Sequence, residues 1–294
     1  HAALFGELPT DRYLFMTMVV GNGYGGLEHR FSTSLICGRS DLPRPGVGGV
    51  DKGYRKFLGL CSHEYFHLWN VKRIRPARLA GADLSTEVHT ELLWAFEGIT
   101  SYYDDLGVVR SGTITPRDYL EGLAGTVTRV LRGAGRHRQS IAASSFDAWT
   151  RFYKQDENAP NAIVSYYAKG ALVALGLDVT LRMRSGDRHC LDDLMRRLWE
   201  RFGRTGREML GHAAPQFLQK AVAAFDPFVG PLETLFRRRR EHHEQPHRVR
   251  TEPCDQLLRV DGVALVLGHL RTVLQHHALR EQVGERFRRR AQSF

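Results

Sequence analysis

The stretch "SHEYFHLWN", residues 62–70, places two histidines four positions apart, with a glutamate directly after the first. Apolar residues recur at three- and four-residue spacing from about residue 53, and "RIRP" stops this pattern at Pro76. The stretch is therefore predicted to lie on a helix. Residues four apart on a helix share one face, so His63 and His67 can present both imidazoles to one cation.

Glu64 projects beside that face, where its carboxylate could take a proton from a water without ligating the metal. This HExxH pattern is typical of zinc peptidases. Histidine is frequent here, 14 of 294 residues, so an ordinary polar helix face is the alternative. A catalytic zinc site also needs a third protein ligand and an open position for water.

Glu97 is the best candidate for the third ligand. It lies in "LLWAFEGITSYYDD", residues 92–105, among apolar neighbours where an unpaired charge would be costly. A cation would satisfy it; the alternative is a carboxylate that faces solvent or pairs with an arginine. Two turns further on, Asp104 and Asp105 could hold a ligand histidine by its second ring nitrogen, or could be surface charges.

Length and composition describe a globular chain. With 294 residues and 42% apolar content, it can bury a substantial core in one large or two smaller domains. No run approaches the roughly 18 to 20 apolar residues of a membrane span, so none is expected. The four cysteines never form CxxC and fit free thiols in a reducing compartment, which favours the cytoplasm. The chain starts at His1 without a visible signal peptide, which leaves a periplasmic location open.

The net charge of +10 raises the question of nucleic-acid binding. Residues 237–294 hold 13 arginines, no lysines and 7 acidic residues, a net of +6, which leaves +4 for the first 236. The basic tail has little aromatic interleaving for base stacking. No nucleic-acid partner is therefore expected, and the sequence does not reveal the oligomeric state.

The pattern along the chain predicts an α+β fold with a small β-sheet at the N-terminal side and a mainly helical body. Residues 11–38 alternate strand-like runs around "GNGYGG", which predicts a hairpin or a bent strand. Helical periodicity follows at 85–109, 113–131, 161–186, 191–202 and 214–225.

Several stretches resemble one known family. "HEYFHLWNVKRIRP", residues 63–76, followed 30 positions after His67 by Glu97 in "WAFEGITSYYDDL", is similar to the glycyl aminopeptidase family of gluzincin zinc peptidases, relatives of aminopeptidase N and thermolysin. Further matches are "HAALFGELPTDRYLF", "GYGGLEHRFST" and "NAIVSYYAKGALVALGLDVTLR". The resemblance covers roughly residues 1–200 and implies a thermolysin-like catalytic domain.

The resemblance implies one zinc ion per chain, with His63, His67 and Glu97 as ligands and Glu64 as general base. This set matches the pattern of the family position by position. Zinc would polarise the scissile carbonyl, and Glu64 would carry the proton of the attacking water to the leaving amine.

The resemblance also implies residues that contact the substrate. In "YAKG", Tyr167 matches a tyrosine beside the tetrahedral oxyanion, with Tyr166 as the neighbouring alternative. In "GGLEH", Gly25 and Gly26 would let the peptide backbone approach, and Glu28 would bind its free ammonium. The alternatives are a packed aromatic for Tyr167 and a tight hairpin with an exposed Glu28.

Two parts of the family pattern are missing. Members usually carry an N-terminal β domain, which is not seen here, and commonly end in a PDZ domain. "DQLLRVDGVAL" and "LGHLRTVLQ" resemble only the second half of a PDZ domain. The predicted organisation is a catalytic domain at 1–243 and a basic linker with a partial PDZ-like segment at 244–294.

The implied function is a zinc aminopeptidase that removes a first residue, Gly or Ala, from peptides with a free N-terminus. One alternative is a catalytically impaired scaffold that binds peptides through its PDZ-like tail, and another is a zinc endopeptidase. A basic nucleic-acid-binding module is a third alternative, which the near-balanced charge of the first 236 residues disfavours.

Overall fold

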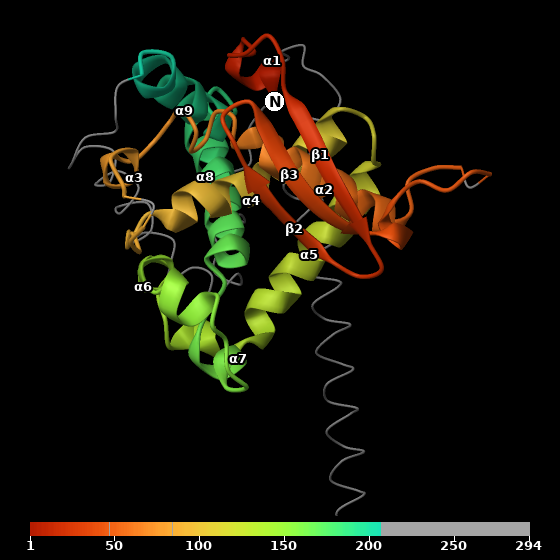
Figure 1. The fold of residues 1–294 in the computed structure, drawn as a ribbon. Helices are drawn as coiled ribbons and strands as arrows, with labels where there is room; N and C mark the ends of the chain where they lie inside the picture. The colour runs from red at the N-terminus through yellow and green to blue at the C-terminus, as the bar shows by residue number, and fades with distance from the viewer. Residues whose placement is uncertain (47, 84, 207–294) are drawn as a thin grey trace, which may run out of the picture.

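The computed structural model describes residues 1–46, 48–83 and 85–206. In this part of the chain a small sheet lies against a mainly helical body (Figure 1), which confirms the predicted α+β class. The predicted helix at 214–225, the domain boundary after residue 243 and the PDZ-like segment lie outside the described residues.

The sheet has three strands, β1 (Leu14–Val20), β2 (Tyr24–Glu28) and β3 (Ser32–Gly38), in the order β1-β3-β2. β3 pairs in parallel with β1 and antiparallel with β2. A hairpin around "GNGYGG" was the wrong expectation, because β3 lies between the strands that this turn joins. Alternation predicts strands but not which strands pair.

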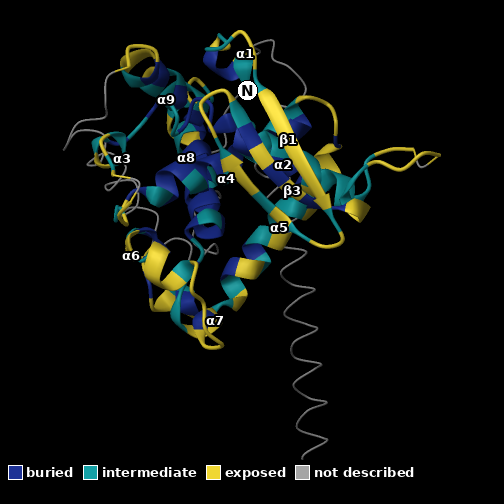
Figure 2. Ribbon diagram, viewed as in Figure 1, coloured by how far each residue is buried: buried dark blue, intermediate teal, exposed yellow. Residues whose placement is uncertain are grey.

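The sheet packs on the helical body through one face. On β3, Thr33, Leu35 and Cys37 are buried while Ser34 and Ile36 are exposed, and helix α2 (Lys52–Phe66) contacts both β2 and β3. β1 stays largely exposed, as Figure 2 shows. β2 therefore lies where it can contribute side chains and backbone to a site over α2.

Helix α2 (Lys52–Phe66) carries most of the opening motif. It begins at Asp51, whose carboxylate accepts a hydrogen bond of 2.8 Å from the Tyr54 N–H. It ends at Phe66, well before Pro76, so the predicted C-terminal boundary was wrong. Val71 has a φ of 129°, which no helix accommodates, so the chain turns sharply just after the motif.

Helices α4 (Leu93–Arg110) and α8 (Tyr166–Ser185) form the centre of the body. A Cβ atom at Gly98 would lie 2.6 Å from Gly170 Cα, so glycine is required where the two backbones touch. α4 begins later than the predicted residue 85. The close crossing brings the residues beside Gly98 near the first turn of α8.

The remaining elements support these helices. Helix α5 (Pro116–Arg132) begins as predicted: Thr115 caps it, Pro116 opens it, and the Asp118 side chain completes the capping box. The other described elements are α1 (Ala2–Phe5), η1 (Arg39–Asp41), α3 (Ala77–Ala80), α5 (Pro116–Arg132), η2 (Ala134–His137), α6 (Ile141–Phe146), the π-helix η3 (Ala148–Phe152), α7 (Ala159–Ala162), α9 (Leu191–Leu198) and the π-helix η4 (Trp199–Gly203).

One helical stretch in the described residues, Ala159–Ser185, is long and apolar enough by composition to cross a membrane. Within the protein, 67% of its apolar window is buried, which is also what the core helix of a globular protein shows. The stretch is therefore weak evidence for a membrane span.

Candidate metal and catalytic site

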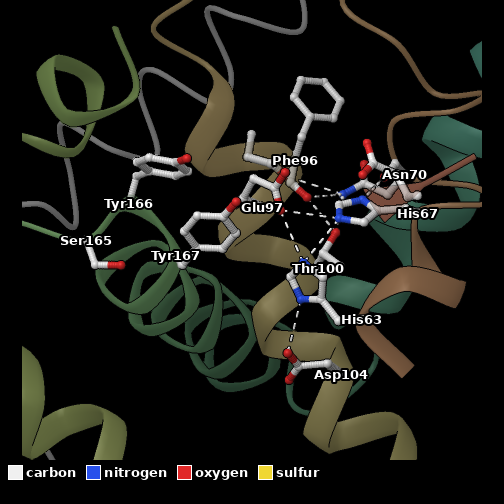
Figure 3. Close-up of polar contacts among 12 residues, drawn as sticks. His63, His67, Asn70, Phe96, Glu97, Thr100, Asp104, Ser165, Tyr166 and Tyr167 are labelled. Carbon is white, nitrogen blue, oxygen red and sulfur yellow. Dashed lines mark hydrogen bonds and ion pairs between the residues drawn. The ribbon is translucent and has the colours of Figure 1, made fainter. Parts of the chain in front are cut away.

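His63, His67 and Glu97 meet between α2 and α4 (Figure 3). The Nε2 atoms of His63 and His67 each lie 3.2 Å from Glu97 Oε2 and 3.2 Å from each other. Ligand atoms about 2.0 to 2.1 Å from one tetrahedral centre lie about 3.3 Å apart. The three atoms therefore have the spacing that a single tetrahedral cation requires.

Both imidazoles are oriented through their other ring nitrogen. His67 Nδ1–H donates to the Asn70 carbonyl at 2.8 Å, and His63 Nδ1–H donates to Asp104 Oδ2 at 3.2 Å. In the neutral form of each imidazole, Nε2 then carries the lone pair that a cation between His63, His67 and Glu97 would use. Such hydrogen-bonded partners are the usual supports of metal-ligating histidines.

The electrostatics of this cluster favour a positive charge at its centre. Burial alone lowers the pKa of His63, but hydrogen bonds to Asp104 and Glu97 outweigh it and raise the pKa to about 10. Burial alone raises the pKa of Glu97, but His67 and His63 hold that pKa below its usual range. Three converging acceptor atoms repel one another unless a proton or a cation lies between them. Two imidazoles and one carboxylate are ligands that zinc accepts, so the site fits this ion.

The Glu64 carboxylate lies beside the cluster. The residue is only 5% exposed, and within the described part of the chain its Oε2 atom has no hydrogen-bond partner. Burial raises the pKa of Glu64 to about 7, although the charges of His67 and His63 act in the opposite direction. A buried carboxylate with an unused acceptor and a pKa near neutrality is suited to proton transfer.

The two glycines of β2 have different surroundings. A Cβ atom at Gly26 would overlap the Glu64 carboxylate, whereas a Cβ at Gly25 would meet nothing within 4 Å. Gly26 therefore leaves room for Glu64, a role that was not predicted. Gly25 faces open space, as close approach of a peptide backbone requires.

Glu28 pairs with a lysine that the sequence interpretation missed. Lys72 Nζ lies 3.0 Å from Glu28 Oε1. Ligand atoms of Glu28, Glu64 and His67 lie within 4.8 Å of one another, so this ion pair borders the candidate site. The only signal in the sequence is the place of Lys72 in the same motif, five positions after His67.

Val71 connects two of these contacts. Its φ of 129° is strained for a β-branched residue. The residue before it, Asn70, accepts the His67 hydrogen bond, and the residue after it, Lys72, pairs with Glu28. Strain of this kind concentrates where the surrounding structure fixes functional groups.

The two candidate tyrosines differ in exposure and direction. Tyr166 is fully buried, whereas Tyr167 is only partly buried and points its hydroxyl toward Glu97 in Figure 3. The Tyr167 and His63 ring centres are 6.1 Å apart. Burial, and then the negative charge of Glu97, raise the pKa of Tyr167, so the phenol remains protonated and able to donate.

Residues 56–173 match the M61 glycyl aminopeptidase family. The M61 segment contains the HExxH motif, Glu97 and Tyr167, whereas β2 with Glu28 lies before it. The resemblance predicted from the sequence is confirmed.

A solved structure matches a larger share of the chain than this segment. An aminopeptidase N family protein from Idiomarina loihiensis is 47% identical, with a TM-score of 0.70. The match covers 75% of this chain but only 40% of that one, so the chain spans less than half of that protein. No curated protein matches.

Replacing Glu97 with Gln should weaken zinc binding by at least about tenfold, because even the loss of an outer partner of a metal ligand costs that much. Competition with a chromophoric chelator measures this affinity. Glu121→Gln, on the exposed face of α5, is the matched control and should bind like the unmodified protein. Full, tight zinc occupancy in Glu97→Gln would show that Glu97 is not a ligand.

Proposed function

We propose that this chain is a zinc-dependent aminopeptidase with a thermolysin-like, gluzincin active site, and that it removes Gly or Ala from the N-terminus of peptides. The observation that carries the proposal is the set of three ligand atoms, each 3.2 Å from the other two, with the Glu64 carboxylate beside them. One zinc ion per chain would be held by His63, His67 and Glu97.

Glu64 would act as the general base. When bound, zinc would supply Lewis acidity to the scissile carbonyl and to the attacking water. Glu64 would take the proton of that water and pass it to the leaving amine. The absence of a side chain at Gly26 lets the Glu64 carboxylate occupy this position.

Tyr167 would stabilise the oxyanion that forms during attack. Its hydroxyl is directed toward the cluster, and its raised pKa keeps the proton in place. A neutral phenol can donate a hydrogen bond to developing negative charge, and this interaction is strongest in the transition state.

Glu28 would recognise the free ammonium of the substrate. An ionised carboxylate offers about four acceptor positions, so Glu28, which pairs with Lys72 through Oε1, can accept a second cation. The open space at Gly25 allows the first residue of the peptide to lie along β2. Aminopeptidase selectivity would follow from this ammonium contact.

The deciding experiment combines zinc analysis with release of an arylamine from glycyl and alanyl arylamides. We expect one zinc per chain and release that a chelator abolishes and added zinc restores. Zinc binding without turnover would favour a peptide-binding scaffold, and internal cleavage would favour an endopeptidase. A cytoplasmic location and the absence of a nucleic-acid partner are proposals that rest on composition alone.

A further inference from the structure

Three tyrosine hydroxyls meet at the side of the site that faces α8. Tyr153 follows the π-helix η3, and its hydroxyl lies 3.0 Å from the Tyr167 hydroxyl. The Tyr166 hydroxyl donates to Tyr153 at 3.3 Å. Tyr153 itself is 64% exposed, so it lies at the solvent edge of the site.

Packing among the rings of Tyr166, Tyr167 and Phe152 holds these hydroxyls in place. Tyr166 and Tyr167 are stacked with ring centres 4.6 Å apart, and Phe152 lies 4.8 Å from Tyr166 and 5.8 Å from Tyr167. Phe152 ends η3 and Tyr153 follows it directly. Single π-turns often occur at functional sites, and this one delivers Phe152 and Tyr153 to the first turn of α8.

Either hydroxyl of the Tyr153–Tyr167 pair can donate the hydrogen bond between them. A phenol has one proton to donate and can also accept. Tyr166 donates to Tyr153, and the Tyr153 proton can then go to the Tyr167 oxygen or to solvent. In the arrangement in which Tyr153 donates to Tyr167, the Tyr167 hydroxyl keeps its own proton for another acceptor. Consecutive hydrogen bonds also polarise one another, which strengthens the last donor.

We propose that Tyr153 donates to Tyr167 and so acts as a positioning residue that directs the Tyr167 proton toward the oxyanion. This inference rests on the proposed function, because it assumes that Tyr167 donates in the transition state. Tyr153 does not need to touch the reacting atoms; it fixes the rotation of one hydroxyl and strengthens it as a donor. Its contribution should therefore appear in kcat rather than in KM.

A double-mutant cycle tests the proposal. Tyr153→Phe should lower kcat about 2- to 10-fold, the effect of one neutral hydrogen bond, with little change in KM. Tyr167→Phe should lower kcat about 10²-fold. In the Tyr167→Phe background, Tyr153→Phe should have no further effect, because the Tyr167 hydroxyl that Tyr153 would orient is absent. Tyr54→Phe, at the start of α2, is the matched control and should be neutral.

Three kinetic outcomes would overturn the proposed role of Tyr153. An equal loss from Tyr153→Phe in both backgrounds would show an independent role. A rise in KM alone would show direct substrate contact. Normal turnover in Tyr167→Phe would remove the oxyanion role of Tyr167, and with it the proposed function of that residue, while leaving the zinc site untouched.

A second measurement does not depend on activity. In protein labelled with ¹³C at tyrosine Cζ, the Tyr167 resonance should shift in Tyr153→Phe, because the ring remains and only the hydroxyl is lost. The Tyr54→Phe control should leave it in place. An unchanged Tyr167 resonance in Tyr153→Phe would overturn the proposed hydrogen bond even in a protein without turnover.

Discussion

Glu64→Gln should lower kcat by at least about 10²-fold while the protein keeps its zinc. Glutamine preserves the size and polarity of the side chain but cannot accept the proton of the attacking water. Since Glu64 lies beside the three ligand atoms without being one of them, zinc affinity should change little. Arylamide turnover and zinc content, measured on the same sample, separate the two effects.

Glu121→Gln serves as the surface control for this substitution and should retain full turnover. The environment of Glu64 offers an independent route to the same result. Gly26→Ala would push the Glu64 carboxylate from its place, whereas Gly21→Ala adds a methyl group where nothing lies within 4 Å. We expect a large loss of turnover from the first and almost none from the second. Near-normal turnover of zinc-loaded Glu64→Gln would remove Glu64 from the mechanism.

Local signals predicted local structure well. Thr115, Pro116 and Asp118 specify the start of α5 through contacts within four residues, and the structure has this start. The end of α2 was missed because it depends on the strained Val71 and the hydrogen bond from His67 to Asn70. The strand order was missed because pairing joins residues that the alternating pattern does not distinguish.

The candidate site shows the same difference between features set by local sequence and features that depend on long-range contacts. His63 and His67 share one helical turn, so their convergence follows from spacing alone. Glu97 required a chemical argument about a carboxylate among apolar neighbours, together with the family resemblance. Lys72 contacts Glu28 and Tyr153 contacts Tyr167 across the fold, and the sequence around Lys72 and Tyr153 does not specify these partners.

The choice between an aminopeptidase and an endopeptidase depends on Glu28, because both reactions use the same metal chemistry. An N-acetylated peptide lacks the positive charge that Glu28 would bind. Removing one partner of a buried charged hydrogen bond costs about 2 to 5 kcal/mol. Because Lys72 stays beside Glu28, the carboxylate is not left alone, and we expect the lower end of this range.

Blocked peptides should therefore be cleaved at least about 30-fold more slowly than free ones at equal concentration, since 1.4 kcal/mol corresponds to a factor of ten. Parallel measurements of kcat/KM on a free and an N-acetylated glycyl peptide test this ratio. Glu28→Ala should reduce the ratio toward one by impairing the free peptide and leaving the blocked peptide little changed. Glu87→Ala, which removes an exposed glutamate whose Oε2 lies 3.6 Å from His89 Nε2, is the control and should keep the preference.

Efficient internal cleavage of N-acetylated peptides by the unmodified protein would contradict the aminopeptidase proposal. The proposed set of zinc ligands would not be affected by that result. A preference for free peptides that survives Glu28→Ala would instead move ammonium recognition to another group. A carboxylate oxygen of Glu64 lies within 4.8 Å of one of Glu28, so Glu64 would then be the carboxylate to examine. In that case one carboxylate would have to bind the ammonium and also accept the water proton. These two tasks conflict, because a bound ammonium lowers the pKa of a neighbouring carboxylate and so weakens it as a base.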